Sequence, residues 1–86
     1  MSKWGDCAEK IYNLIANSSY DYRYRTEDIL ENVFDTSLIF IDYKDLVEIV
    51  KERVYPKVCK LVHTPYDTHW VTYLERKIKE WESFYN

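Results

Sequence analysis

The chain has 86 residues, a net charge of −3, 47% hydrophobic residues and 31% charged residues. This balance is typical of one globular domain and excludes a disordered chain, and no apolar run approaches the roughly 18 residues of a membrane span. The first residues include no apolar stretch that could act as a secretory signal. We therefore expect a single domain over residues 1–86, located in the cytoplasm, with Cys7 and Cys59 as reduced thiols.

Aromatic residues make up 17% of the chain, as nine tyrosines, three tryptophans and three phenylalanines. This is more than a core of this size usually holds. Large rings carry much contact area, and the polar tips of Tyr and Trp tolerate water. The surplus therefore predicts a surface that docks onto another molecule.

The charge is uneven along the chain. Residues 1–50 carry five Lys or Arg against ten Asp or Glu, whereas residues 51–86 carry seven against five. The acidic excess consists of Glu27, Asp28, Glu31, Asp35, Asp42, Asp45 and Glu48, with Lys44 as the one basic residue among them. Such a region repels phosphate and favours a basic partner, the alternative being an ordinary solvated helix face.

The first half of the chain predicts two helices separated by a period-two segment. Apolar residues at helical spacing indicate a helix over residues 7–17, with Asp6 as its N-cap. Residues 20–25, Tyr-Asp-Tyr-Arg-Tyr-Arg, alternate as a strand does. Thr26 is then the expected N-cap of a helix over residues 27–35. The expected buried side of that helix consists of Ile29, Leu30, Val33 and Phe34.

The second half predicts further helices. Residues 37–41 are compatible with a buried strand or with the start of a helix, and we expect helix from Asp42 onward. Pro56 predicts a kink or a break near Tyr55. A last helix over residues 69–84 would align Trp70, Leu74, Ile78, Trp81 and Tyr85. The predicted fold is a mainly α, single-domain bundle of four or five helices, with a two-stranded element (20–24 with 38–41) as an alternative.

The candidate binding site combines the tyrosine-arginine segment with the carboxylates that follow it. Tyr and Arg are enriched where proteins bind one another, and carboxylates would orient a basic partner. The candidate partner-binding residues are Tyr20, Tyr22, Arg23, Tyr24, Arg25, Glu27, Asp28, Glu31 and Asp35. They suggest a small protein-binding module. One form would be an inhibitor that binds a nucleic-acid-handling protein, as small phage-encoded inhibitors do. The grounds for this suggestion are the size, the charge and the lack of motifs.

Two other interpretations stay open. Interleaved aromatic and arginine side chains can stack unpaired bases and bind phosphate, so residues 20–25 and the basic cluster Lys51, Arg53, Lys57 and Lys60 could bind single-stranded RNA or DNA. Arg76, Lys77 and Lys79 could extend that basic cluster. Alternatively, Trp70, Trp81 and Tyr85 could form the interface of a homo-oligomer.

No motif predicts catalysis or a cofactor. Gly5 is the sole glycine, so there is no glycine-rich phosphate loop, and no nucleophile has an assignable base. Cys59 and His63, four residues apart, with Cys7 elsewhere, lack the paired spacing of a zinc site. We therefore expect neither enzyme activity nor a bound metal or cofactor.

Overall fold

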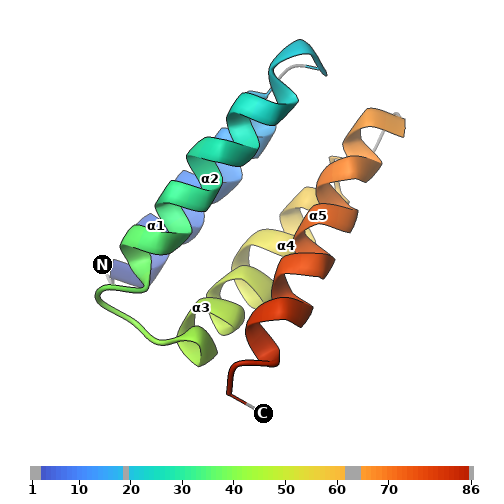
Figure 1. Cartoon of the computed structure of the whole chain (residues 1–86). Helices are drawn as coiled ribbons and strands as arrows, with labels where there is room; N and C mark the ends of the chain where they lie inside the picture. Colours follow the sequence, from blue (N-terminus) through green and yellow to red (C-terminus); the bar gives the residue numbers. More distant parts are fainter. Residues whose placement is uncertain (1–2, 19, 62–64, 86) are drawn as a thin grey trace.

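The computed structural model describes the backbone of residues 3–18, 20–61 and 65–85, and the side chains of residues 5–18, 21–61 and 68–85. Within these ranges the chain is mainly α-helical, as predicted, and contains no strand (Figure 1). The elements are α1 (Lys3–Ala16), the 3-10 turn η1 (Tyr20–Tyr22), α2 (Arg23–Ser37), α3 (Tyr43–Ile49), the π-helical η2 (Val50–Val54), α4 (Tyr55–Cys59) and α5 (Pro65–Glu82). Because α3, η2 and α4 are continuous, the described residues form four helical rods.

Helix α1 has the predicted buried stripe but a different start. Ala8, Ile11 and Ile15 are buried, as their spacing predicts. The helix begins at Lys3, so Asp6 lies inside it and the predicted N-cap at this residue is wrong.

The predicted strand over residues 20–25 is wrong, and so is its pairing with residues 38–41. Residues 20–22 form η1, and α2 begins at Arg23, four residues earlier than expected. The reason is that the buried stripe of α2 begins at Thr26 and continues through Leu30 and Phe34, one residue every four. Thr26 is therefore a core position rather than an N-cap, and its hydroxyl donates a 3.1 Å hydrogen bond to Tyr22 O and lies 3.1 Å from Ser18 Oγ.

A tight turn connects α2 to α3. Residues 38–41 form turns and are neither strand nor helix, because the amides of Ile39 and Phe40 bond three residues back, to Thr36 O at 3.2 Å and Ser37 O at 3.0 Å. Asp42 then caps α3, because its Oδ1 accepts a 2.9 Å hydrogen bond from the Asp45 amide. The predicted start of helix at this point is confirmed.

The predicted irregularity before Pro56 takes the form of a π-helical segment, η2. Proline has no amide hydrogen, so the carbonyl four residues before it loses its helical donor. The helix widens instead, and the Tyr55 amide bonds to Val50 O, five residues back. Helix α4 starts at Tyr55, with Pro56 in its first turn, where proline is tolerated.

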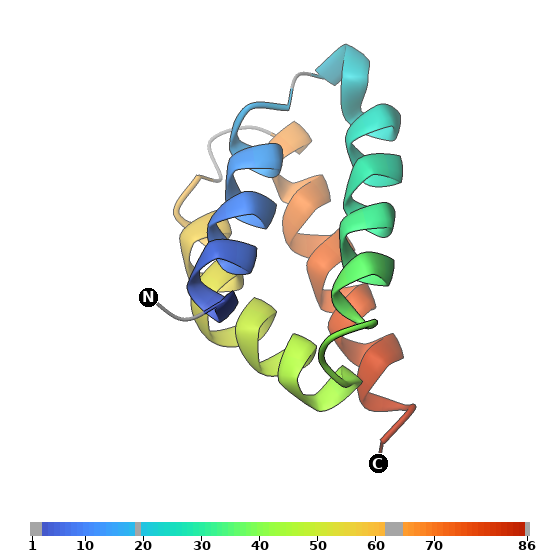
Figure 2. The same ribbon diagram turned by 90° about the vertical axis from the view of Figure 1, so that its left-hand side faces the viewer.

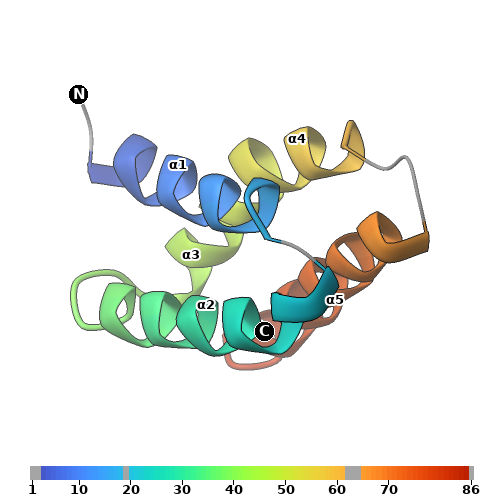
Figure 3. The ribbon, with the colours of Figure 1, turned by 90° about the horizontal axis from the view of Figure 1, so that it is seen from above.

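The helices form two layers around one core. Viewed from above, α1 and α4 lie on one side of the molecule and α2 and α5 on the other (Figure 3). Helix α5 contributes five buried hydrophobic side chains, Trp70, Tyr73, Leu74, Ile78 and Trp81. Trp81 packs edge-on against Phe34 of α2, with ring centroids 4.8 Å apart. The start of α2 and the α2–α3 turn lie at opposite ends of the molecule (Figure 2).

Candidate functional site

Four consecutive residues where η1 passes into α2 form a patch that we call the tyrosine corner. Tyr22, Tyr24 and Arg25 are exposed, and Arg23 is half-buried. The side chains of Tyr22 and Tyr24 are 60% and 69% exposed. The Arg23 guanidinium donates a 3.0 Å hydrogen bond to Tyr24 Oη and lies 4.8 Å from the centre of the Tyr24 ring. The Tyr24 ring is therefore held in place while it remains accessible. The side chain of Tyr20 lies outside the described residues.

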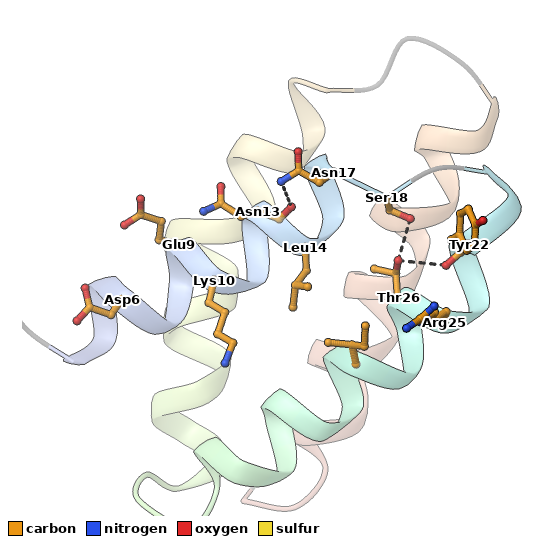
Figure 4. Close-up of a pocket in the computed structure, with 11 residues that line it drawn as sticks. Asp6, Glu9, Lys10, Asn13, Leu14, Asn17, Ser18, Tyr22, Arg25 and Thr26 are labelled. Atoms are coloured by element: carbon orange, nitrogen blue, oxygen red, sulfur yellow. Dashed lines mark hydrogen bonds between the residues drawn. The ribbon is translucent and has the colours of Figure 1, made fainter.

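The tyrosine corner borders an open groove of about 680 Å³ between α1 and α2 (Figure 4). Tyr22 and Arg25 lie at one end of this groove, and Leu14 points into it from α1 (Figure 4). Its charged lining consists of Asp6, Glu9, Lys10 and Arg25. Because the two signs balance, the groove does not select a ligand by charge.

Two of the predicted site carboxylates, Glu27 and Glu31, face α5. Glu27 lies 3.5 Å from His69 Nε2 and 3.9 Å from Arg76. Glu31 accepts a 2.7 Å hydrogen bond from Tyr73 Oη and a 3.0 Å hydrogen bond from Lys77 Nζ. Both carboxylates therefore bridge two helices of this chain, which leaves them less available to a partner.

These contacts change the ionisation of the groups involved. Burial alone would raise the pKa of Glu31, but hydrogen bonds from Lys77 and Tyr73, with the charge of Lys77, outweigh it and lower the pKa below the usual 4.5. Burial and the hydrogen bond to Glu31 raise the pKa of Tyr73 well above its usual value. On the opposite side of the fold, a hydrogen bond to Glu75 raises the pKa of Tyr55 to about 12.

The other two predicted carboxylates, Asp28 and Asp35, are exposed on α2. The structure thus brings Tyr22 to Arg25 together at the corner, leaves Asp28 and Asp35 on the solvent side, and turns Glu27 and Glu31 toward α5. The predicted site is divided between two sides of the same helix.

A second exposed surface lies at the opposite end of α2. Sequence reasoning placed Asp42, Asp45 and Glu48 in its acidic region but missed the exposed apolar side chains beside them. We call this surface the aromatic–acidic end, and it consists of Ile39, Phe40, Tyr43, Phe84 and Tyr85 with the carboxylates of Asp42, Asp45, Glu48 and Glu82. The α2–α3 turn, α3 and the end of α5 meet at this end of the fold (Figures 1 and 2). The rings of Tyr43 and Phe84 stack with centroids 4.6 Å apart.

The negative charges of three of these carboxylates act on Tyr85. Partial burial and the charges of Glu82, Glu48 and Asp42 raise the pKa of Tyr85. The run Leu38-Ile39-Phe40-Ile41 beside Asp42 was the available sequence signal, but its apolar character led to its interpretation as a buried element.

The basic residues of the second half are only partly available as a patch. Lys51, Arg53, Lys57 and Lys60 are exposed, and Lys57 lies 5.5 Å from the centre of the Tyr12 ring. Lys77, in contrast, is buried against Glu31 and Glu80. The continuous η2–α4 segment, which carries Lys51, Arg53 and Lys57, and the start of α2 lie apart in Figures 1 and 3, so the basic cluster and the tyrosine corner do not form one surface.

The residues nominated for a self-interface and for metal binding are placed as follows. Trp70 and Trp81 are buried in the core of the single chain, so a rigid second copy could not contact them. Cys7 and Cys59 are thiols, and Cys7 Sγ lies 3.5 Å from Ser37 Oγ. His63 lies outside the described residues, among which no group of three or more His, Cys, Asp or Glu side chains could hold a metal ion.

No protein-family model, curated protein or solved structure matches the chain. Of the helices in the described ranges, none has both the length and the apolar character needed to cross a membrane.

Proposed function

We propose that the protein is a small, non-enzymatic, cytoplasmic binding module that docks the tyrosine corner onto a larger protein. The observation that carries this proposal is the exposure of two neighbouring tyrosine rings, Tyr22 and Tyr24, at 60% and 69%. Tyrosine and arginine dominate the residues that contribute most to protein interfaces, because they combine large contact area with polar tips.

The local geometry supports docking without a large ordering cost. Arg23 holds the Tyr24 ring through a hydrogen bond and a cation–π contact. A side chain ordered before binding loses less entropy when it is buried by a partner. The adjacent groove between α1 and α2 offers a concave surface beside the rings.

The test is affinity capture from a lysate of the source organism, followed by comparison of site variants. Replacement of Tyr22 and Tyr24 with alanine should reduce retention of the captured partner at least tenfold, because hot-spot residues each contribute about 2 kcal/mol or more. The variant with both tyrosines replaced by phenylalanine keeps the rings and should retain most binding. Equal retention by the alanine variant would remove the tyrosine corner from the proposal.

Stability must be unchanged for this comparison to be valid. Both rings are exposed, so the alanine variant should unfold within about 0.5 kcal/mol of the wild type. The double variant Asp28→Asn/Asp35→Asn tests whether the exposed carboxylates of α2 contribute to partner binding. A loss of partner binding that is present at low salt and disappears at high salt would show that these carboxylates orient a basic partner.

Binding of single-stranded nucleic acid is the second candidate function, with residues 20–25 and the Lys51–Lys60 cluster as two separate contact surfaces. The exposure of Lys51, Arg53, Lys57 and Lys60 favours it. It predicts an electrophoretic shift of single-stranded RNA or DNA that weakens steeply with salt. The absence of a shift at low salt would eliminate it.

A further inference from the structure

The aromatic–acidic end presents apolar side chains that the fold holds outward. Leu38 packs against the core and Ile41 is buried, so the two residues between them cannot turn inward. Ile39 and Phe40 are consequently 75% and 73% exposed. Their exposure does not result from fraying, because backbone hydrogen bonds of 3.0–3.2 Å close the turn at each residue from Leu38 to Ile41.

The end of α5 adds two more rings to the same surface. After the helix ends, the Phe84 amide bonds to Trp81 O at 3.0 Å, and this turn directs Phe84 onto Tyr43 of α3. Phe84 nevertheless remains 59% exposed, and Tyr85 beside it is 39% exposed. Monomeric proteins seldom leave such a group of large apolar side chains in water without an interaction that uses it.

The charges around these rings have one predominant sign. Residues 38–48 and 81–85 contain four carboxylates, Asp42, Asp45, Glu48 and Glu82, against one ammonium group, Lys44. A surface of this composition repels nucleic acid and anionic lipid. It also disfavours a symmetric pair of copies, because each copy would bring its four carboxylates toward those of the other.

We propose that the aromatic–acidic end binds a basic amphipathic helix of another protein. Apolar side chains of that helix would cover Ile39, Phe40 and Phe84, and its lysines or arginines would meet the surrounding carboxylates and the faces of the exposed rings. This surface lies at the far end of α2 from the tyrosine corner, and the inference does not depend on the proposed function (Figure 2).

The probe is a fluorescein-labelled, 18-residue amphipathic helix of leucine and lysine, with an otherwise identical peptide in which glutamate replaces lysine. Fluorescence anisotropy of the full chain with each peptide should show at least tenfold tighter binding of the lysine peptide. Ile39→Ser/Phe40→Ser should weaken that binding at least tenfold. These side chains are exposed, so the variant should keep its helical circular dichroism and its unfolding midpoint.

Charge is tested separately from apolar contact. Glu48→Gln/Glu82→Gln should weaken binding of the lysine peptide several-fold at 50 mM salt, and the loss should shrink at 300 mM salt. The matched control, Asp21→Asn/Asp28→Asn, removes the same charge at the other end of α2 and should change binding less than twofold. Tyr22→Ala/Tyr24→Ala should also bind as the wild type does, which separates this surface from the tyrosine corner.

Several results would overturn the inference. They are equal affinity for the two peptides, unchanged affinity in Ile39→Ser/Phe40→Ser, and an equal loss in Asp21→Asn/Asp28→Asn. A dimer in sedimentation that this serine variant dissociates would instead assign the surface to a second copy of the chain.

Discussion

Tyr73 and Glu31 join α5 to α2 through a 2.7 Å hydrogen bond from the tyrosine hydroxyl to Glu31 Oε1. Lys77, one helical turn after Tyr73, lies 2.9 Å from the same oxygen and donates to Oε2 at 3.0 Å. The long side chains span the space between the two helices beside the Phe34–Trp81 contact. This cluster explains why part of the acidic sequence of α2 serves the fold.

Replacement of Glu31 by glutamine should destabilise the protein. The change removes the charge that pairs with the nearly buried Lys77, and hydrogen bonds to charged groups contribute about 1–3 kcal/mol, so we expect a loss of about 1–2 kcal/mol in the free energy of unfolding. Asp35→Asn, an exposed change of the same kind on the same helix, should cost less than about 0.5 kcal/mol. Urea unfolding at pH 7 measures both, and equal effects would contradict the assignment.

The contribution of Glu31 should depend on pH in a defined direction. The pKa of this carboxyl is lower in the folded chain than its usual 4.5, so the unfolded state takes up a proton first as the pH falls. The stability it contributes is therefore complete above about pH 4.5 and is lost as the pH falls through the folded pKa. Unfolding curves from pH 7 to pH 3 should show the wild type approaching Glu31→Gln. A difference in the free energy of unfolding between the two proteins that stays constant over this pH range would contradict the prediction.

Tyr73 should give the corresponding effect at alkaline pH. Burial and the hydrogen bond to Glu31 raise its pKa in the folded chain above the usual 10.0, so the unfolded state loses its proton first. The wild type should lose stability relative to Tyr73→Phe as the pH rises above 10, whereas below pH 10 it should be more stable by about 1 kcal/mol. Thermal unfolding of both proteins at pH 8 and pH 11 measures this change. An equal stability difference between them at the two pH values would show that the fold does not raise the pKa of the Tyr73 hydroxyl.

Leu30 and Ile29 test the orientation of α2. Leu30 is fully buried, whereas its neighbour Ile29, which the sequence also assigned to the buried side, is 40% exposed. Leu30→Ala should cost about 2–5 kcal/mol because it leaves a cavity, and Ile29→Ala should cost about 1 kcal/mol or less. Chemical unfolding of both variants measures the difference, and a larger loss at Ile29 would require a rotated helix.

Thr26 distinguishes a helix interior from a helix cap. Aspartate is a good N-cap, so Thr26→Asp would be tolerated if α2 began there. In the structure this side chain is buried, and a carboxylate at the position should destabilise the protein by more than about 2 kcal/mol. Thr36→Asp, exposed on the same helix, provides the control for lost helix propensity. Similar unfolding midpoints for the two variants would support the original prediction that residue 26 is the N-cap of this helix.

Local patterns in the sequence are sufficient to predict the helical class and much of the core. Ile11 and Ile15, like Leu74 and Ile78, recur at helical spacing, and such residues are buried whenever the helix has a partner to pack against. The N-cap of α3 at Asp42 and the irregularity before Pro56 were also predictable. An N-cap side chain and the missing amide hydrogen of a proline affect only hydrogen bonds within about one helical turn of themselves.

The locations of the tyrosines and charged side chains, in contrast, depend on contacts between helices that are distant in the sequence. The alternation over residues 20–25 has no neighbouring strand in the described fold, and α2 extends back past the buried Thr26 instead. Glu27 and Glu31 are acidic residues of α2, as Asp28 is, but α5 supplies cations to Glu27 and Glu31, whereas Asp28 is exposed. Ile39 and Phe40 are exposed because Leu38 and Ile41 occupy the core positions at that turn. Which of these four apolar residues are buried depends on packing between segments that are distant in the sequence.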